Sequence, residues 1–372
     1  MKKIFIVALA ATLLAVGCQK TEIINPVGNA IAFSTGLNKL TKASDADSTG
    51  TYNLQEQNFR VWAYGAYEDE NTLVNEMNEI YDHIENLPVT YTTSWGTTKE
   101  YYWPGVGKDL KFFAVSADPT FLGTAGATST TVDVTPGASI EEATMTVKGF
   151  VVDPNSPNED LMVADFVQQN QDDKVVDLSF HHTLSKVEFV FKTLASTDTT
   201  KAAPQVFVQK ILVKDLATKG TLTVSRDTAG TIATDSTKYI AKVVPVDFTW
   251  AVDTTSTFTA DFSDDWLKTV SYPEGADSTA VLDTTAMELT VEPQTFTTWL
   301  MLPQTITGKK VEVTYVINKR QFTSIFALDK ANLTAWTDNQ RIIYNVTLAP
   351  NIISFNPTVE EWANPTNKEF QN

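Results

Sequence analysis

Cysteine and histidine are scarce in this sequence, which contains one cysteine, Cys18, and three histidines among 372 residues. A single thiol cannot form an intramolecular disulfide, so packing alone must stabilise the fold. No zinc-binding helix, phosphate-binding loop or serine-nucleophile elbow is present. The adjacent His181 and His182 would point to opposite faces of a strand and could not bind one metal together. We therefore predict no catalytic residues, no metal site and no cofactor.

Basic residues are also in short supply, with 28 Lys and Arg against 45 Asp and Glu and a formal net charge of -17. A surface of this sign repels the phosphates of nucleic acids and the headgroups of anionic lipids. Solubility is a sufficient explanation of the acidity. The charge therefore excludes nucleic acid as a partner and identifies no other.

Long hydrophobic runs are missing apart from one at the N-terminus, where residues 4–16 are almost entirely apolar and follow Lys2 and Lys3. A membrane-spanning helix needs about 20 apolar residues, so this run is too short to be one. It ends in LLAVGC and resembles a bacterial lipoprotein signal, which implies cleavage after Gly17 and acylation of Cys18, as by palmitate. The alternative is an ordinary secretory signal that happens to contain a cysteine. Removal of residues 1–17 would leave 355 residues, enough for two domains of about 150 residues each.

Short alternating runs rich in Val, Thr, Phe and Tyr, separated by Gly, Pro, Asn and Asp, dominate the rest of the chain. This period-two pattern is typical of half-buried strands and favours an all-β fold built of sandwiches. The clearest runs are NAIAFST (29–35), FRVWAYGAY (59–67), KVEFVFK (186–192) and RIIYNVTL (341–348). Helical spacing occurs only in residues 68–85, with one short turn at 329–336. A polar stretch, residues 168–174, predicts a boundary between domains 18–173 and 174–372.

Aromatic residues gather in the segment SWGTTKEYYWP (94–104). Such side chains can stack on sugar rings, so one interpretation is a glycan-binding surface with Trp95 and Trp103 as its platform. Tyrosine and tryptophan in β-sandwiches also pack in the core or at sheet edges, which is the competing interpretation. The sequence leaves both open.

Several motifs follow one another in a defined order along nearly the whole chain. They are Ile31-Ala32-Phe33 with Lys42 soon after, FRVWAYGAY (59–67), YYWP (101–104), LKFFAVSA (110–117), DLMVAD (160–165), SFHHTLSKVEFVF (179–191), Trp336, the run at 341–348 and ISFNPTVEEW (353–362). Together with the lipoprotein signal, this ordered set resembles the fimbrillin family, the lipoprotein precursors of type V pilus subunits in Gram-negative anaerobes. The resemblance implies two tandem transthyretin-like β-sandwiches, few short helices and no enzymatic activity.

The resemblance also implies assembly by donor-strand exchange, in which a protease removes the N-terminal strand and a strand of a neighbouring subunit fills the groove. Backbone hydrogen bonds and alternate apolar side chains would hold the incoming strand. By position, the removable strand lies within residues 18–42 and carries Ile31, Phe33, Leu37 and Leu40. Cleavage would fall between Lys42 and Ala43, although family members usually have arginine at this point.

The partners implied by the resemblance are other pilus subunits, the outer membrane through the lipid anchor, and ligands on host or bacterial surfaces. The implied location is the fimbrium at the cell surface. Residues 351–372 contain alternating Ile353, Phe355 and Val359, but Pro350 and Pro357 interrupt them, which favours an accessory or tip-like role over a stalk. A surface glycan-binding lipoprotein is the second-ranked function, and an enzyme, for which no residues can be named, ranks third.

The triplet of Asp, then Ser or Thr, then a residue such as Ala or Thr is an O-glycosylation motif in related bacteria. Its acceptor residues in this chain would be Ser48, Thr199, Thr228, Ser236, Thr254, Ser278 and Thr284. All but the first lie between residues 198 and 285, in polar sequence of the kind that forms loops. The alternative is a set of threonine-rich β-turns with no modification.

Overall fold

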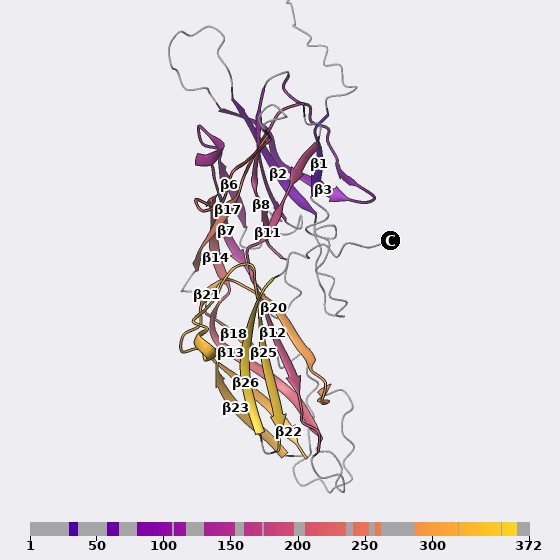
Figure 1. Cartoon of the computed structure of the whole chain (residues 1–372), viewed down its shortest axis with the longest axis vertical. Coiled ribbons are helices and arrows are strands. Elements are labelled where there is room, and N and C mark those ends of the chain that lie inside the picture. The colour runs from indigo at the N-terminus through magenta and orange to yellow at the C-terminus, as the bar shows by residue number, and fades with distance from the viewer. Residues whose placement is uncertain are drawn as a thin grey trace, which may run out of the picture.

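The computed structural model describes residues 30–35, 58–66, 80–105, 108–116, 130–152, 160–172, 175–196, 205–235, 241–252, 257–261, 287–318, 320–350 and 352–362. Nearly all of its regular structure is β-strand, which confirms the all-β prediction. The strands form an upper and a lower group along the long axis of an elongated molecule (Figure 1). In this described part of the chain, no helix has the length and apolar character needed to cross a membrane.

The upper group contains three sheets. The largest follows the order β15 (Ala233–Asp235), β16 (Ala241–Val244), β9 (Phe166–Gln169), β5 (Leu110–Ser116), β2 (Phe59–Ala66), β3 (Ile80–Tyr91) and β4 (Trp95–Thr97), with β8 (Met162–Ala164) and β11 (Phe180–His182) attached. A four-stranded sheet has the order β17 (Val246–Val252), β14 (Lys219–Arg226), β7 (Thr144–Val151) and β6 (Thr131–Thr135). A two-stranded parallel sheet joins β1 (Ala32–Thr35) to β10 (Val175–Leu178). The 3-10 turn η1 (Ile140–Glu142) precedes β7.

The lower group is built from two facing sheets. One has the order β20 (Gln294–Met301), β12 (Ser185–Lys192), β25 (Gln340–Ala349) and β26 (Ile352–Glu361). The other has the order β18 (Thr257–Asp261), β13 (Val206–Ala217), β22 (Lys310–Ile317) and β23 (Arg320–Ala327), and β19 (Met287–Glu288) also pairs with β13. The short strands β21 (Gln304–Thr305) and β24 (Ala335–Trp336) pair with each other. The 3-10 turn η2 (Lys330–Asn332) lies where the sequence predicts a short turn.

The predicted alternation of side chains is confirmed in the lower group. Ile342, Tyr344, Val346 and Leu348 of β25 share one face and are all buried. On the same side of the sandwich, the rings of Phe326 in β23 and Phe355 in β26 stack with centroids 4.9 Å apart. Alternation therefore identified the core face of these strands, because period two places every second side chain on one side of a sheet.

Strand β5, in the middle of the nine-stranded sheet, is buried on both of its faces. In β5, Phe112 and Ala114 point to one face while Phe113 and Val115 point to the other, and all four are fully buried. The first face belongs to a cluster that we name the β1 core, which consists of Ile31, Phe33, Phe59, Val61, Ala63, Ile84, Leu87, Val89, Trp103, Leu110, Phe112, Ala114, Met162, Ala164, Val167, Val176, Leu178 and Phe180. The uninterrupted apolar run of β5 is the sequence sign of a strand covered on both sides.

The second face of this sheet belongs to a cluster that runs without a break from the upper into the lower group. It includes Trp62 and Phe113 from the nine-stranded sheet, Leu222 from β14, and Phe189 and Tyr344 from the lower group. The pairing of β14 with β7 and of β16 with β9 crosses the predicted boundary at residues 173 and 174. The limits 18–173 and 174–372 thus do not coincide with the limits of the sheets, and the division into domains stays a prediction.

The helix predicted for residues 68–85 is wrong from residue 80 onward, where β3 begins, and residues 68–79 lie outside the described part. Strand β3 pairs with β2, with Ile84 opposite Ala63 and Leu87 opposite Val61. The register shifts between these pairs, so one strand carries extra residues as in a β-bulge. Such a bulge breaks the period of two, which is why the apolar spacing imitated that of a helix.

Strand β26 runs through Pro357 without interruption and pairs with β25 from Ile352, opposite Ala349, to Glu361, opposite Gln340. The prediction that Pro357 interrupts this segment is therefore wrong. β26 is the edge strand of its sheet, and a proline without an N–H group is tolerated at an edge.

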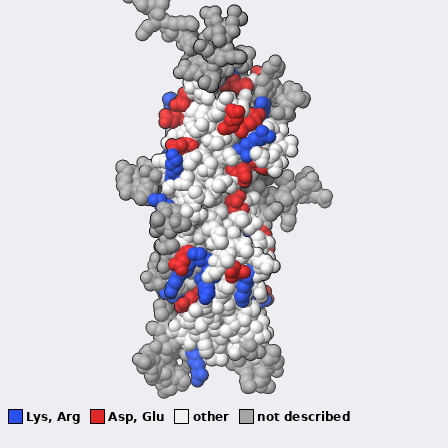
Figure 2. Space-filling model, turned by 90° about the vertical axis from the view of Figure 1, so that its left-hand side faces the viewer, with Lys and Arg blue, Asp and Glu red and all other residues white. Residues whose placement is uncertain are grey.

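Charged side chains of both signs are interspersed on the face shown in Figure 2, with uncharged surface between them.

Glu188 lies on the face of β12 that points away from the core according to the alternation in the sequence. Its side chain is nevertheless only 3% exposed. Lys186 Nζ lies 3.1 Å from one of its carboxylate oxygens, and Arg341 Nη2 lies 2.8 Å from the other. The two basic side chains cover this carboxylate and neutralise it.

Candidate functional site: the seat of strand β1

The backbone of strand β1 forms a ladder with a single described strand. It pairs in parallel with β10, from Ala32 opposite Val175 to Thr35 opposite Leu178. On its other side, the Ile31 N–H donates a hydrogen bond of 2.8 Å to the carbonyl oxygen of Tyr101. Among the described strands, β10 is the only one with which β1 forms a ladder. The isolated bridge of Ala30 to Tyr102 lies beside the Ile31 hydrogen bond, so the backbone is paired along β1 on one side and only just before it on the other.

The side chains of Ile31 and Phe33 are buried in the β1 core, and each residue is 8% exposed. We name the part of this core that the two side chains contact the seat of β1. The Phe33 ring meets Phe59 edge-on at a centroid distance of 6.4 Å and Phe112 at 6.2 Å. The predicted shared inward face of Ile31 and Phe33 is thus confirmed. Burying each of these side chains contributes about 1.5–3 kcal/mol relative to exposure.

Polar contacts fix the end of β1. Ser34 Oγ donates a hydrogen bond of 3.0 Å to Asp177 Oδ1, and Trp95 Nε1 donates one of 3.0 Å to Thr35 Oγ1. Ala32 is exposed on the opposite face from Ile31 and Phe33. Ile31, which directly precedes β1, and Phe33 within it thus face the core, and hydroxyl groups anchor the C-terminal end of the strand.

Segment 94–104 forms one wall of this seat. Trp103 is 5% exposed, and its ring packs against Phe112 at 5.6 Å. Trp95 is partly buried and contacts Phe59 at 4.8 Å and Tyr91 at 5.1 Å. The packing interpretation of these aromatics therefore holds, because the Trp103 ring has no free face to offer a sugar.

His83 lies on β3, not on a helix, beside this wall. Its Nε2–H donates a hydrogen bond of 2.8 Å to the carbonyl oxygen of Tyr102, since a carbonyl can only accept. Burial lowers the pKa of His83 below its ordinary value, and the bond to Tyr102 opposes this shift only partly. The ring is therefore neutral at pH 7 and supports the chain next to β1.

His181 and His182 point to opposite faces of β11, as predicted. His181 Nε2 lies 2.9 Å from Asp165 Oδ1, and His182 Nδ1 lies 2.6 Å from Asp160 Oδ2. Trp362, which follows β26 of the lower group, stacks on His182 with centroids 3.9 Å apart and ring planes 8° from parallel. His182 thus joins the end of the lower group to the upper one. Within the described residues, no three His, Cys, Asp or Glu side chains gather as metal ligands would.

The remaining predicted site residues divide into one described residue and a larger set outside the described part. Thr228 is exposed in a bend after β14, where Asp227 Oδ1 accepts a hydrogen bond of 2.8 Å from the Ala229 N–H. The residues outside the described part are Gly17, Cys18, Leu37, Leu40, Lys42, Ala43, Ser48, Thr199, Ser236, Thr254, Ser278 and Thr284.

Sequence reasoning missed the partner of β1. Strand β10 lies about 140 residues farther along the chain, and a parallel pair leaves no local turn signal that would reveal it. The alternation of Val176 and Leu178 with exposed Val175 and Asp177 marks β10 as a half-buried strand without saying what it pairs with.

The fimbrillin-like family model matches residues 41–362 of this chain. The fold is similar to that of a fimbrial protein from Bacteroides vulgatus, at 15% identity and a TM-score of 0.55, over 90% of this chain and 100% of that one. A proposed cell adhesion protein from Bacteroides uniformis matches at 14% identity and a TM-score of 0.42, over 90% of this chain and 98% of that one. No curated protein matches the sequence. Because the family model spans most of its length, this chain belongs to the fimbrillin-like family.

Proposed function

We propose that this protein is a structural subunit of a cell-surface fimbria, exported as a lipoprotein through Cys18 and assembled by strand exchange at the seat of β1. Membership of the fimbrillin-like family makes it a structural protein of the cell surface and not an enzyme. Its partners are other subunits, the outer membrane through the lipid, and ligands on other surfaces. An accessory or tip position is part of this proposal, but Pro357 does not support it, because β26 continues through that residue.

The observation that carries the proposal is the way β1 is attached. Ile31 and Phe33 are buried in the β1 core, yet the strand has a single ladder partner among the described strands. A cut between Lys42 and Ala43 lies after β1 in the sequence, so it would leave the strand held by non-covalent contacts alone. A strand with apolar side chains at alternate positions could then replace it with the same hydrogen bonds and pockets.

Cleavage after Lys42 is expected to convert the monomeric precursor into a ladder of oligomers. Limited digestion of the full chain with trypsin, followed by gel filtration with light scattering and N-terminal sequencing, measures this. We expect oligomers whose chains begin at or just before Ala43. Replacing Lys39 and Lys42 together with alanine should keep the protein monomeric, because trypsin then lacks its sites beside β1.

Lys108→Ala, at a described and exposed lysine away from this segment, is the matched control and should still give the ladder. A digested protein that begins at Ala43 and stays monomeric at every concentration would contradict strand exchange.

We also propose O-glycosylation at the seven predicted acceptors. Thr228 supports this, because it is exposed in a tight bend where a transferase can reach it. Mass spectrometry of protein from its native cells is expected to find a glycan on the peptide with Thr228, lost in Thr228→Val. An unmodified Thr228 in all such protein would count against the motif.

A further inference from the structure

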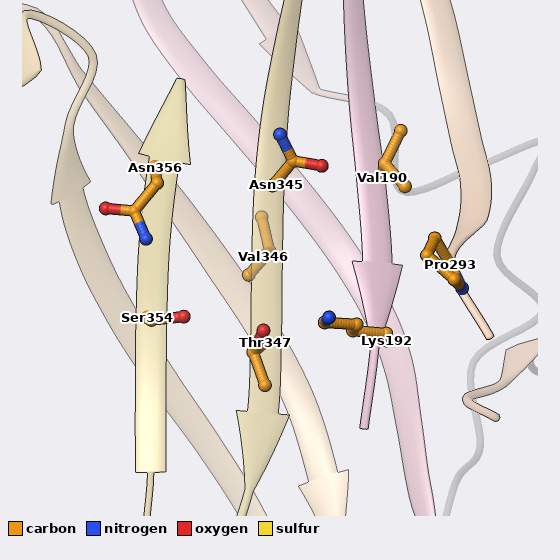
Figure 3. Close-up of a pocket in the computed structure, with 8 residues that line it drawn as sticks. All are labelled: Val190, Lys192, Pro293, Asn345, Val346, Thr347, Ser354 and Asn356. Atoms are coloured by element: carbon orange, nitrogen blue, oxygen red, sulfur yellow. The ribbon is translucent and has the colours of Figure 1, made fainter. Parts of the chain in front are cut away.

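The outer face of the sheet β20-β12-β25-β26 carries a pocket of about 210 Å³ (Figure 3). Its base is Thr347 of β25, which is only 9% exposed. Lys192 of β12 lies on one side, and Ser354 and Asn356 of β26 lie on the other. The pocket is in the lower group, on a different sheet from the seat of β1, so strand exchange does not account for it.

Polar side chains point into this pocket and do not take part in the hydrogen bonds that hold the described sheets together. In Figure 3 the Lys192 ammonium points toward Thr347, and the Ser354 hydroxyl points toward the same residue from the other side. The side chains of these three residues and of Asn356 form no hydrogen bond or ion pair with any other described residue. Their donors and acceptors are therefore available to a ligand.

The charge of the pocket opposes that of the protein. The whole chain has a formal net charge of -17, yet the residues that line the pocket include one lysine and no acid. An ammonium flanked by hydroxyls and an amide favours a carboxylate that also carries hydroxyl groups, because charge-assisted hydrogen bonds are the stronger kind. A neutral ligand would leave the Lys192 charge without a partner.

The size and the apolar side of the pocket narrow the ligand further. Pockets for drug-sized ligands span roughly 300–1,000 Å³, so this one suits a smaller molecule. Val190 and Pro293 supply an apolar wall that can contact C–H groups. A single sugar acid combines hydroxyls, a carboxylate and an apolar C–H face in one ring.

We propose that this pocket binds a carboxylated monosaccharide unit, with Lys192 holding the carboxylate and Thr347, Ser354 and Asn356 holding ring hydroxyls. The site gives the subunit a ligand of its own, separate from its partners in assembly. The pocket proposal does not depend on β1. A result that contradicts ligand binding would therefore not contradict strand exchange, and a result that contradicts strand exchange would not contradict ligand binding.

D-glucuronate is the probe, and two compounds are its controls. D-glucose has the ring hydroxyl groups but no carboxylate, and acetate has a carboxylate but no hydroxyl groups. Titration of the full chain, followed by saturation-transfer NMR of each probe, gives the affinities. We expect glucuronate to bind about tenfold more tightly than glucose or acetate, because only glucuronate reaches both the ammonium and the hydroxyl groups. Equal binding of acetate and glucuronate would overturn the assignment of a sugar, and no binding of glucuronate would overturn the site.

Two variants test whether glucuronate binds in this pocket. Lys192→Gln should weaken glucuronate about tenfold, and Asn356→Asp should weaken it similarly by placing a like charge in the pocket. Lys310→Gln removes the same charge from an exposed position on β22 of the other sheet and should leave the affinity unchanged. Circular dichroism of each variant checks that it is folded. An equal loss in Lys192→Gln and Lys310→Gln would show that net charge, not this pocket, attracts the ligand.

Discussion

Phe33→Asp is expected to destabilise the upper group by about 4 kcal/mol and to open the seat of β1 without any cleavage. The Phe33 ring lies between Phe59 and Phe112 in the β1 core, and a carboxylate there loses both the apolar contacts and its water. Once β1 leaves, these two rings become accessible to solvent and to a strand of another molecule. Urea denaturation measures the stability, and binding of a hydrophobic dye measures the exposed core.

Ala32→Asp is the matched control for this prediction. It places the same charge one residue earlier in β1, where the side chain is exposed, and should cost less than about 0.5 kcal/mol. We further expect oligomers of the full-length Phe33→Asp protein without trypsin, and none of Ala32→Asp. If both variants were equally stable and equally monomeric, β1 would not be the cover of this core.

His182→Ala is expected to lower the free energy of unfolding by about 3 kcal/mol. Asp160 is 3% exposed, and its carboxylate would lose a hydrogen bond of 2.6 Å while staying buried. The stacked contact with Trp362 would be lost as well, which weakens the attachment of the end of β26 to the upper group. Chemical denaturation followed by tryptophan fluorescence measures both effects.

His181→Ala provides the comparison, because it also removes a histidine from an Asp pair on the same strand. The His181 side chain is 33% exposed and has no stacked tryptophan, so water can replace its hydrogen bond. We expect a loss below about 1 kcal/mol. Equal losses in the two variants would mean that burial and the stack at His182 contribute nothing.

Local patterns sufficed where one strand face meets one core. Alternation in β25 identified the four apolar side chains that face the core, and the alternation of Ile31 and Phe33 identified the inward face of β1. Local sequence patterns failed to predict the structure where the backbone departs from the regular period of a strand. The shifted register between β2 and β3 gave residues near Ile84 a helical spacing, and the edge position of β26 made Pro357 harmless.

The sequence by itself determined the all-β class, the lack of disulfides and the family, since these follow from period, composition and the order of motifs. Only the tertiary structure decided what each strand is paired with. The neighbours of β1, the stack of Trp362 on His182, and the meeting of Lys192 with Ser354 and Asn356 all join segments far apart in the chain. Such contacts arise from packing between sheets and leave no trace in the local pattern, because a strand's period records which face is buried and not which partner covers it.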